Sequence, residues 1–71
     1  MDPYEELANA IILQAVKDYR KALRILSRYP YNRPVQYELG SIERFFRSEW
    51  FGILTRLDPE TLIRRLREEA A

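Results

Sequence analysis

Arginine and aromatic side chains are the residues of this sequence best suited to chemistry. Ten of the twelve basic residues are arginine, and nine residues are aromatic. A guanidinium presents a rigid fork of donors to a phosphate or carboxylate, and a flat ring stacks on a base. The two types are interleaved in the segment RFFRSEWF, residues 44–51. This combination predicts a binding site for an anionic ligand with an aromatic part, such as a nucleotide.

Five residues are the candidate ligand contacts on this basis. They are two arginines from a basic stripe in residues 17–28, one turn tyrosine and two arginines of the interleaved segment: Arg20, Arg24, Tyr31, Arg44 and Arg47. Two plainer interpretations remain open. The stripe is also what the solvated face of any amphipathic helix looks like, and Phe46 and Trp50 have the spacing of core residues.

Catalytic groups are poorly represented. The sequence has no cysteine and no histidine, which removes the usual nucleophile, general base and zinc ligands. The adjacent carboxylates Glu5/Glu6 and Glu68/Glu69 would point about 100° apart on a helix, which does not suit an acid–base pair. With two glycines, the chain has no glycine-rich phosphate loop. We therefore expect a binding protein that is not an enzyme and needs no cofactor or metal.

The charge is unevenly distributed along the chain. The net charge is +1, but residues 1–16 carry −3 and residues 17–33 carry +5. A basic segment in a nearly neutral chain favours an anionic partner or an acidic neighbouring subunit. No apolar run approaches the roughly 18 residues of a membrane span, and the acidic N-terminus does not resemble a signal peptide. We expect a protein of the cytoplasm that does not contact a membrane.

Local signals divide residues 1–71, one helical domain, into three expected helices. Asp2 followed by Pro3 predicts a first helix over 3–29, which the prolines of the turn at 29–34 end. Apolar spacing then predicts a second helix over 34–57, either unbroken or kinked near 48–52. Asp58 followed by Pro59 predicts a short third helix over 59–69. The expected fold is all-α, an antiparallel hairpin of two long helices with a short C-terminal helix.

Surplus apolar surface predicts a homo-oligomer. The first helix repeats apolar residues every 3.5 positions, as in a coiled coil, and its apolar face spans about 180°. Phe45 and Phe51 lie beside the main stripe of the second helix. The expected interface residues are Ile12, Ala15, Tyr19, Ala22, Leu26, Phe45 and Phe51. Asp18 projects into the apolar arc, either as a structural ion pair with an arginine or as a group that orders a ligand.

Two stretches of the chain carry a resemblance to known sequences. LANAIILQAVKDYRKAL (residues 7–23) and ERFFRSEWFGILTRLDPETLIRRL (residues 43–66) resemble small uncharacterised proteins from prophages of Firmicutes. The resemblance implies a phage accessory protein acting in the host cytoplasm. Phages of this kind carry small helical oligomers that counter host defence, some of which sequester nucleotide immune signals, although no motif assigns this chain to such a family.

Three functions follow as alternatives. The first is an oligomeric sponge that sequesters a nucleotide-derived host immune signal without cleaving it. The second is an inhibitor that covers the surface of a host defence enzyme. The third is a small nucleic-acid-associated phage regulator that uses the basic stripe, although the turn at 29–34 does not resemble a helix-turn-helix.

Overall fold

The computed structural model describes residues 2–70, and these residues form four α-helices and no strand. The helices are α1 (Pro3–Arg28), α2 (Arg33–Phe46), α3 (Glu49–Leu54) and α4 (Pro59–Ala70). The all-α class is confirmed. Within the same residues, no helix has the length and apolar character needed to cross a membrane.

Two helices begin where the sequence predicts. The Asp2 side chain accepts a hydrogen bond from the Tyr4 backbone N–H at 3.0 Å, and Pro3 occupies the first turn of α1. The Asp58 carboxylate accepts from both the backbone N–H and the hydroxyl of Thr61, at 3.1 and 2.6 Å. These caps satisfy N–H groups that have no partner within the helix.

The expected second helix is two helices, so an unbroken helix over 34–57 is wrong. α2 ends at Phe46, and Ser48 has an extended backbone (φ −79°, ψ 158°) that starts α3. The Ser48 hydroxyl donates to the Phe45 carbonyl at 2.7 Å and accepts from the Phe51 N–H at 3.2 Å. Serine favours such helix ends because its hydroxyl replaces backbone partners. The break lies at the start of the stretch where a kink was expected.

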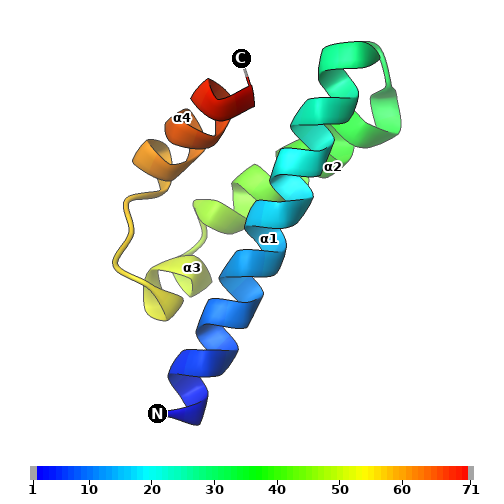
Figure 1. Cartoon of the computed structure of the whole chain (residues 1–71). Helices are drawn as coiled ribbons and strands as arrows, with labels where there is room; N and C mark the ends of the chain where they lie inside the picture. The colour runs from blue at the N-terminus through cyan, green and yellow to red at the C-terminus, as the bar shows by residue number, and fades with distance from the viewer. Residues whose placement is uncertain (1, 71) are drawn as a thin grey trace.

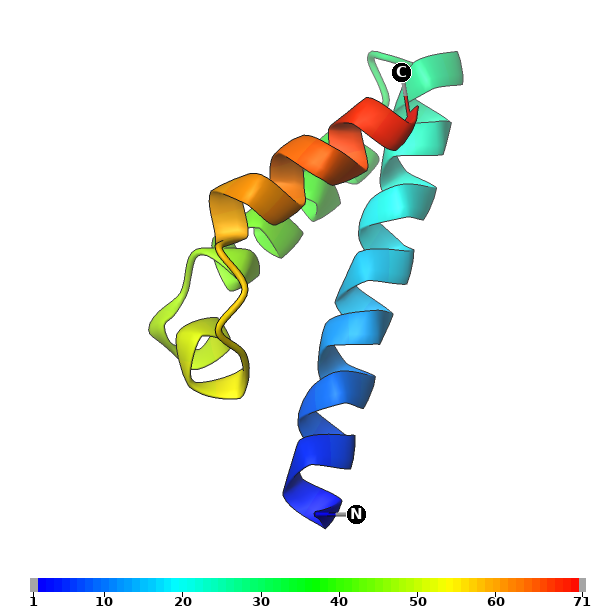
Figure 2. The ribbon, with the colours of Figure 1, turned by 60° about the vertical axis from the view of Figure 1, so that its left-hand side comes forward.

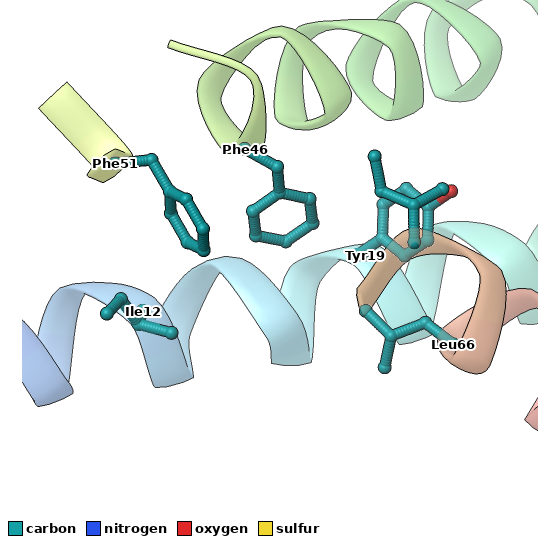
Figure 3. Packing of buried hydrophobic residues seen from close by; sticks show 6 residues of the cluster. Ile12, Tyr19, Phe46, Phe51 and Leu66 are labelled. Carbon is teal, nitrogen blue, oxygen red and sulfur yellow. The ribbon is translucent and has the colours of Figure 1, made fainter. Parts of the chain in front are cut away.

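The break brings Phe51 into the core. Tyr19, Phe46 and Phe51 are almost fully buried and meet in edge-to-face contacts, with ring centroids 5.7 Å apart for Tyr19–Phe46 and 5.5 Å for Phe46–Phe51. Figure 3 shows these rings between α1 and the ends of α2 and α3, with Ile12 on one side and Leu66 of α4 on the other. One core therefore joins all four helices.

The helices are arranged around α1. Figure 1 shows α2 turning back beside the C-terminal half of α1, with α3 and then α4 following. Both ribbon views show the first turns of α1 extending beyond α3 (Figures 1 and 2). The N-terminal part of α1 is thus covered less completely by its own chain than the rest of the helix.

A tyrosine–arginine hollow as the candidate binding site

An open hollow of about 610 Å³ lies along one face of α2 and the turn before it. We call it the tyrosine–arginine hollow, and its lining consists of Tyr31, Arg33, Gln36, Tyr37, Gly40 and Arg44. The α2 members are three or four residues apart, so they share a face of the helix. The hollow therefore depends on one helix and its N-terminal turn.

Two hydrogen bonds hold the turn against α2. The Asn32 side chain accepts from the Val35 N–H at 3.3 Å and caps the helix. The Gln36 amide then donates to the Pro30 carbonyl at 2.6 Å, across the turn. Pro30 and Pro34 also restrict the backbone on either side. Tyr31 is thus held at the mouth of the hollow by short-range contacts.

The aromatic rings of the hollow are available to a ligand. Tyr31 and Tyr37 are 89% and 75% exposed. The Arg44 guanidinium carbon lies 5.8 Å from the centre of the Tyr37 ring, within the range of a cation–π contact. A Cβ at Gly40 would stand 3.7 Å from an Arg44 Nη atom, which is an ordinary van der Waals distance. The Arg44 guanidinium therefore lies over the Tyr37 ring at one side of the hollow.

The arginines of the hollow have no carboxylate partner. Among residues 2–70, no Asp or Glu oxygen lies within 4.0 Å of a charged nitrogen of Arg33 or Arg44. An incoming phosphate or carboxylate would be the first anion that these two guanidinium groups contact, and a bidentate contact is the stronger form of such pairing.

The five predicted ligand residues are separated by the structure. Tyr31 and Arg44 share the hollow, whereas Arg20, Arg24 and Arg47 lie elsewhere. The sequence reasoning missed Arg33 and Tyr37, the other arginine and ring of the hollow. Their helical spacing to Arg44 was a usable signal, because residues 33, 37, 40 and 44 repeat every three or four positions.

Two of the other three predicted arginines are held by glutamates. Arg20 makes a two-pronged contact with Glu69 of α4, at 3.0 and 3.2 Å. Arg24 lies beside that pair in a small hollow of about 160 Å³. Arg47 makes a similar two-pronged contact with Glu60, at 2.6 and 2.9 Å. Arg20 and Arg47 thus attach α4 to α1 and to the end of α2.

Glu43 is the centre of a polar junction next to the core. It accepts from the Tyr19 hydroxyl at 2.6 Å and from Arg67 of α4, and Arg47 lies 3.6 Å away. Burial alone raises the pKa of Glu43, but the hydrogen bonds from Tyr19 and Arg67 and the arginine charges outweigh it, so the pKa is lowered. Burial, and then the bond to Glu43, raise the pKa of Tyr19. The junction holds a charged Glu43 and a neutral Tyr19, and it joins α1, α2 and α4.

The residues expected at a subunit interface mostly contribute to the core of the single chain. Four of them, Ile12, Tyr19, Ala22 and Phe51, are buried by the chain's own helices. Ala15, Leu26 and Phe45 are partly buried, and Ala15 and Phe45 pack against the core. Within the described chain, these residues therefore pack the helices against one another.

Asp18 is half-buried and accepts a hydrogen bond from the Gln14 amide at 2.9 Å. No arginine of residues 2–70 forms an ion pair with it, so the expected arginine partner is not found within the chain.

Comparisons with known proteins add no identity. No family model matches the chain, and neither a curated protein nor a solved structure matches it. Within residues 2–70, no cluster of three potential ligand side chains could hold a metal ion. The function of the chain is therefore inferred from its own residues and their geometry.

Proposed function

We propose that this protein binds a nucleotide-derived signal in the tyrosine–arginine hollow and sequesters it without cleaving it. The observation that carries the proposal is the pairing of two exposed rings with two arginines that face no carboxylate. Rings stack on bases whatever the base, and arginines bind phosphates.

The chemistry of the lining supports capture and not turnover. Tyrosine, arginine and glutamine supply a stacking surface, donors and an amide, and the chain has no histidine or cysteine to act as a base or nucleophile. A carboxylate would repel a phosphate, and none lines the hollow. The lining thus favours an anion that is bound and released without chemical change.

The setting of this activity is also a proposal. The resemblance to prophage proteins supports a phage-encoded protein that acts in the host cytoplasm against a nucleotide immune signal. In that role the protein lowers the free concentration of the signal, so its effect depends on affinity and on the number of hollows per assembly.

Native mass spectrometry of the full chain tests the proposal. The protein is mixed with cyclic oligonucleotides and with ADP-ribose derivatives, and the bound molecule is recovered after denaturation. We expect a defined added mass for at least one compound, which is recovered unchanged. No added mass from any compound overturns the proposal, and recovery of a cleaved product overturns capture without turnover.

Matched variants locate the site. Arg44→Ala and Tyr37→Ala should weaken binding tenfold or more, equivalent to about 1.4 kcal/mol or more. Tyr37→Phe keeps the ring and should bind nearly as the wild type does. Arg65→Ala is the charge-matched control, because Arg65 is exposed on α4 and lies outside the hollow. Equal losses for Arg44→Ala and Arg65→Ala would show a general charge effect in place of a site.

A further inference from the structure

An apolar groove runs along the N-terminal half of α1. It consists of two adjoining hollows that share Ile11, one of about 370 Å³ between α1 and α3 and one of about 380 Å³ between α1 and α2. Large apolar side chains line it and remain exposed to solvent: Leu7, Trp50 and Ile53 are 60%, 54% and 81% exposed. Contiguous exposed apolar surface of this kind marks an interaction site.

We propose that a second copy of this chain docks its α1 in this groove, antiparallel and around a two-fold axis at Ile11. The groove holds residues at both ends of α1's exposed stretch, with Tyr4 seven positions before Ile11 and Asp18 seven positions after it. Seven residues are about two helical turns, or about 10 Å. A two-fold axis at Ile11 therefore places Tyr4 of each copy opposite Asp18 of the other.

The two ends of the groove are chemically complementary. The Tyr4 hydroxyl can donate, and within the described chain it makes no side-chain hydrogen bond and is 81% exposed. Asp18 accepts from Gln14 alone, which leaves its carboxylate with free acceptor positions. The antiparallel arrangement gives each Asp18 a donor from the other copy. This also supplies the partner that a half-buried carboxylate in an apolar face needs.

Side-chain size is complementary about the same axis. Leu7 and Ala15 each lie four positions from Ile11 in the groove, so a large residue of one copy faces a small residue of the other. Two leucines facing each other would keep the helices apart. Alternation of large and small residues lets facing helices approach closely.

This inference does not rest on ligand binding, because the groove and the tyrosine–arginine hollow share no residue. Arg44→Ala should weaken capture tenfold or more and keep the dimer. Loss of the dimer with capture intact would refute the groove proposal alone.

Light scattering after size exclusion tests the dimer with the full chain. We expect a mass twice 8.6 kDa for the wild type at micromolar concentrations. Ile11→Glu should raise the dissociation constant at least tenfold. Leu13→Glu is the matched control and should remain dimeric, because Leu13 is 57% exposed on α1 and lies outside the groove. A wild type that is monomeric throughout, as expected if the groove serves a different protein, overturns the proposal.

Two further variants test the register in case Ile11→Glu does not fold. Tyr4→Phe removes the hydroxyl that donates to Asp18 of the other copy and should weaken the dimer. The chain has no cysteine, so Ile11→Cys provides one thiol per copy at the axis and should form a disulfide-linked dimer under mild oxidation. Leu13→Cys should not. A dimer that neither weakens in Tyr4→Phe nor crosslinks through Ile11→Cys overturns the antiparallel arrangement.

Discussion

The arginines that attach α4 and the arginines of the tyrosine–arginine hollow differ in what faces them. Arg20 and Arg47 each meet a glutamate in a two-pronged contact. Arg33 and Arg44 meet no carboxylate of residues 2–70, and Arg44 lies against a tyrosine ring. The same side chain thus serves attachment in one region and is open to an outside anion in the other.

Position in the fold, and not residue type, therefore separates an arginine that forms a structural ion pair from one that faces no carboxylate of the described chain. α4 brings Glu69 to Arg20 of α1 and Glu60 to Arg47 at the end of α2. The hollow lies on the face of α2 near the turn, and no residue of α4 lines it. Removing a carboxylate from the α4 attachment, or an arginine from either region, tests whether the two sets of arginines have different roles.

The largest effect should come from the centre of the α4 attachment. Glu43→Ala removes the acceptor of the buried Tyr19 hydroxyl and of Arg67. We expect the free energy of unfolding to fall by about 2–3 kcal/mol. A hydrogen bond to a charged group contributes about 1.5–3 kcal/mol, and the bond from the buried Tyr19 accounts for most of the loss because Arg67 is half exposed. Urea denaturation measures the loss.

Glu38→Ala is the control for that variant. Glu38 is exposed on the same helix and forms no ion pair within the described chain. Its removal should change the free energy of unfolding by no more than about 0.5 kcal/mol. Equal losses for the two variants would mean that Glu43 contributes through helix formation and not through the junction.

Acid should weaken the same attachment. The pKa of Glu43 is lowered by its bonds to Tyr19 and Arg67 against the opposing effect of burial, and Arg47 lowers the pKa of Glu60. Both start from an ordinary value of 4.5. As the pH falls below that value, the unfolded chain takes up protons first, so stability is lost as the pH approaches the folded pKa.

Denaturation at a series of pH values between neutrality and acid measures this loss. Glu43→Gln should flatten the slope below the ordinary glutamate pKa, since it removes one of the groups that titrate differently in the two states. An unchanged slope in Glu43→Gln would assign the acid sensitivity to the other carboxylates.

Replacing one arginine of each region by alanine should separate effects on stability from effects on binding. Arg44→Ala should reduce affinity for the bound nucleotide tenfold or more and leave the free energy of unfolding nearly unchanged. Arg47→Ala should do the reverse, with nearly unchanged affinity and the small loss of stability that is typical of an exposed ion pair. Calorimetric titration and urea denaturation of both variants measure the two effects. Reduced affinity in Arg47→Ala would remove the distinction between the regions.

The starts of α1 and α4 followed from local signals, whereas the break in the second helix was predicted only as a kink near 48–52, beside the alternative of an unbroken helix. Asp2 and Asp58, each followed by proline, act within their own first turns, so the sequence sufficed to place them. Apolar spacing continues from Phe46 to Trp50 across the break before Ser48, and for this reason the sequence left the unbroken helix open. In the structure Phe51 is buried and Trp50 is 54% exposed. Which of the neighbouring aromatics Trp50 and Phe51 is buried depends on how the helices pack, and apolar spacing alone does not determine it.

The candidate site was predicted in part for a related reason. Tyr31 and Arg44 were grouped by residue type, and the structure places both in one hollow. Arg20 and Arg47 had the same type, but Glu69 and Glu60 lie 49 and 13 residues away in sequence. Partners this distant depend on where α4 packs, and local sequence does not contain that information.

The smallest effect should come from releasing one arginine of the attached region. Glu69→Gln frees Arg20 beside Arg24, which creates a second pair of arginines without an acidic partner. Its cost should be no more than about 0.5 kcal/mol, because both side chains of the original pair are about half exposed. High salt should reduce the difference from the wild type, since exposed charges are screened.

The freed pair should still not capture a nucleotide, because no aromatic ring lines the hollow around Arg20 and Arg24. Native mass spectrometry of Glu69→Gln combined with Arg44→Ala isolates this hollow from the first one. We expect no added mass in the double variant. A nucleotide bound as tightly as in the wild type would mean that unpaired arginines suffice, and the tyrosines of the first hollow would then have no part in selecting the ligand.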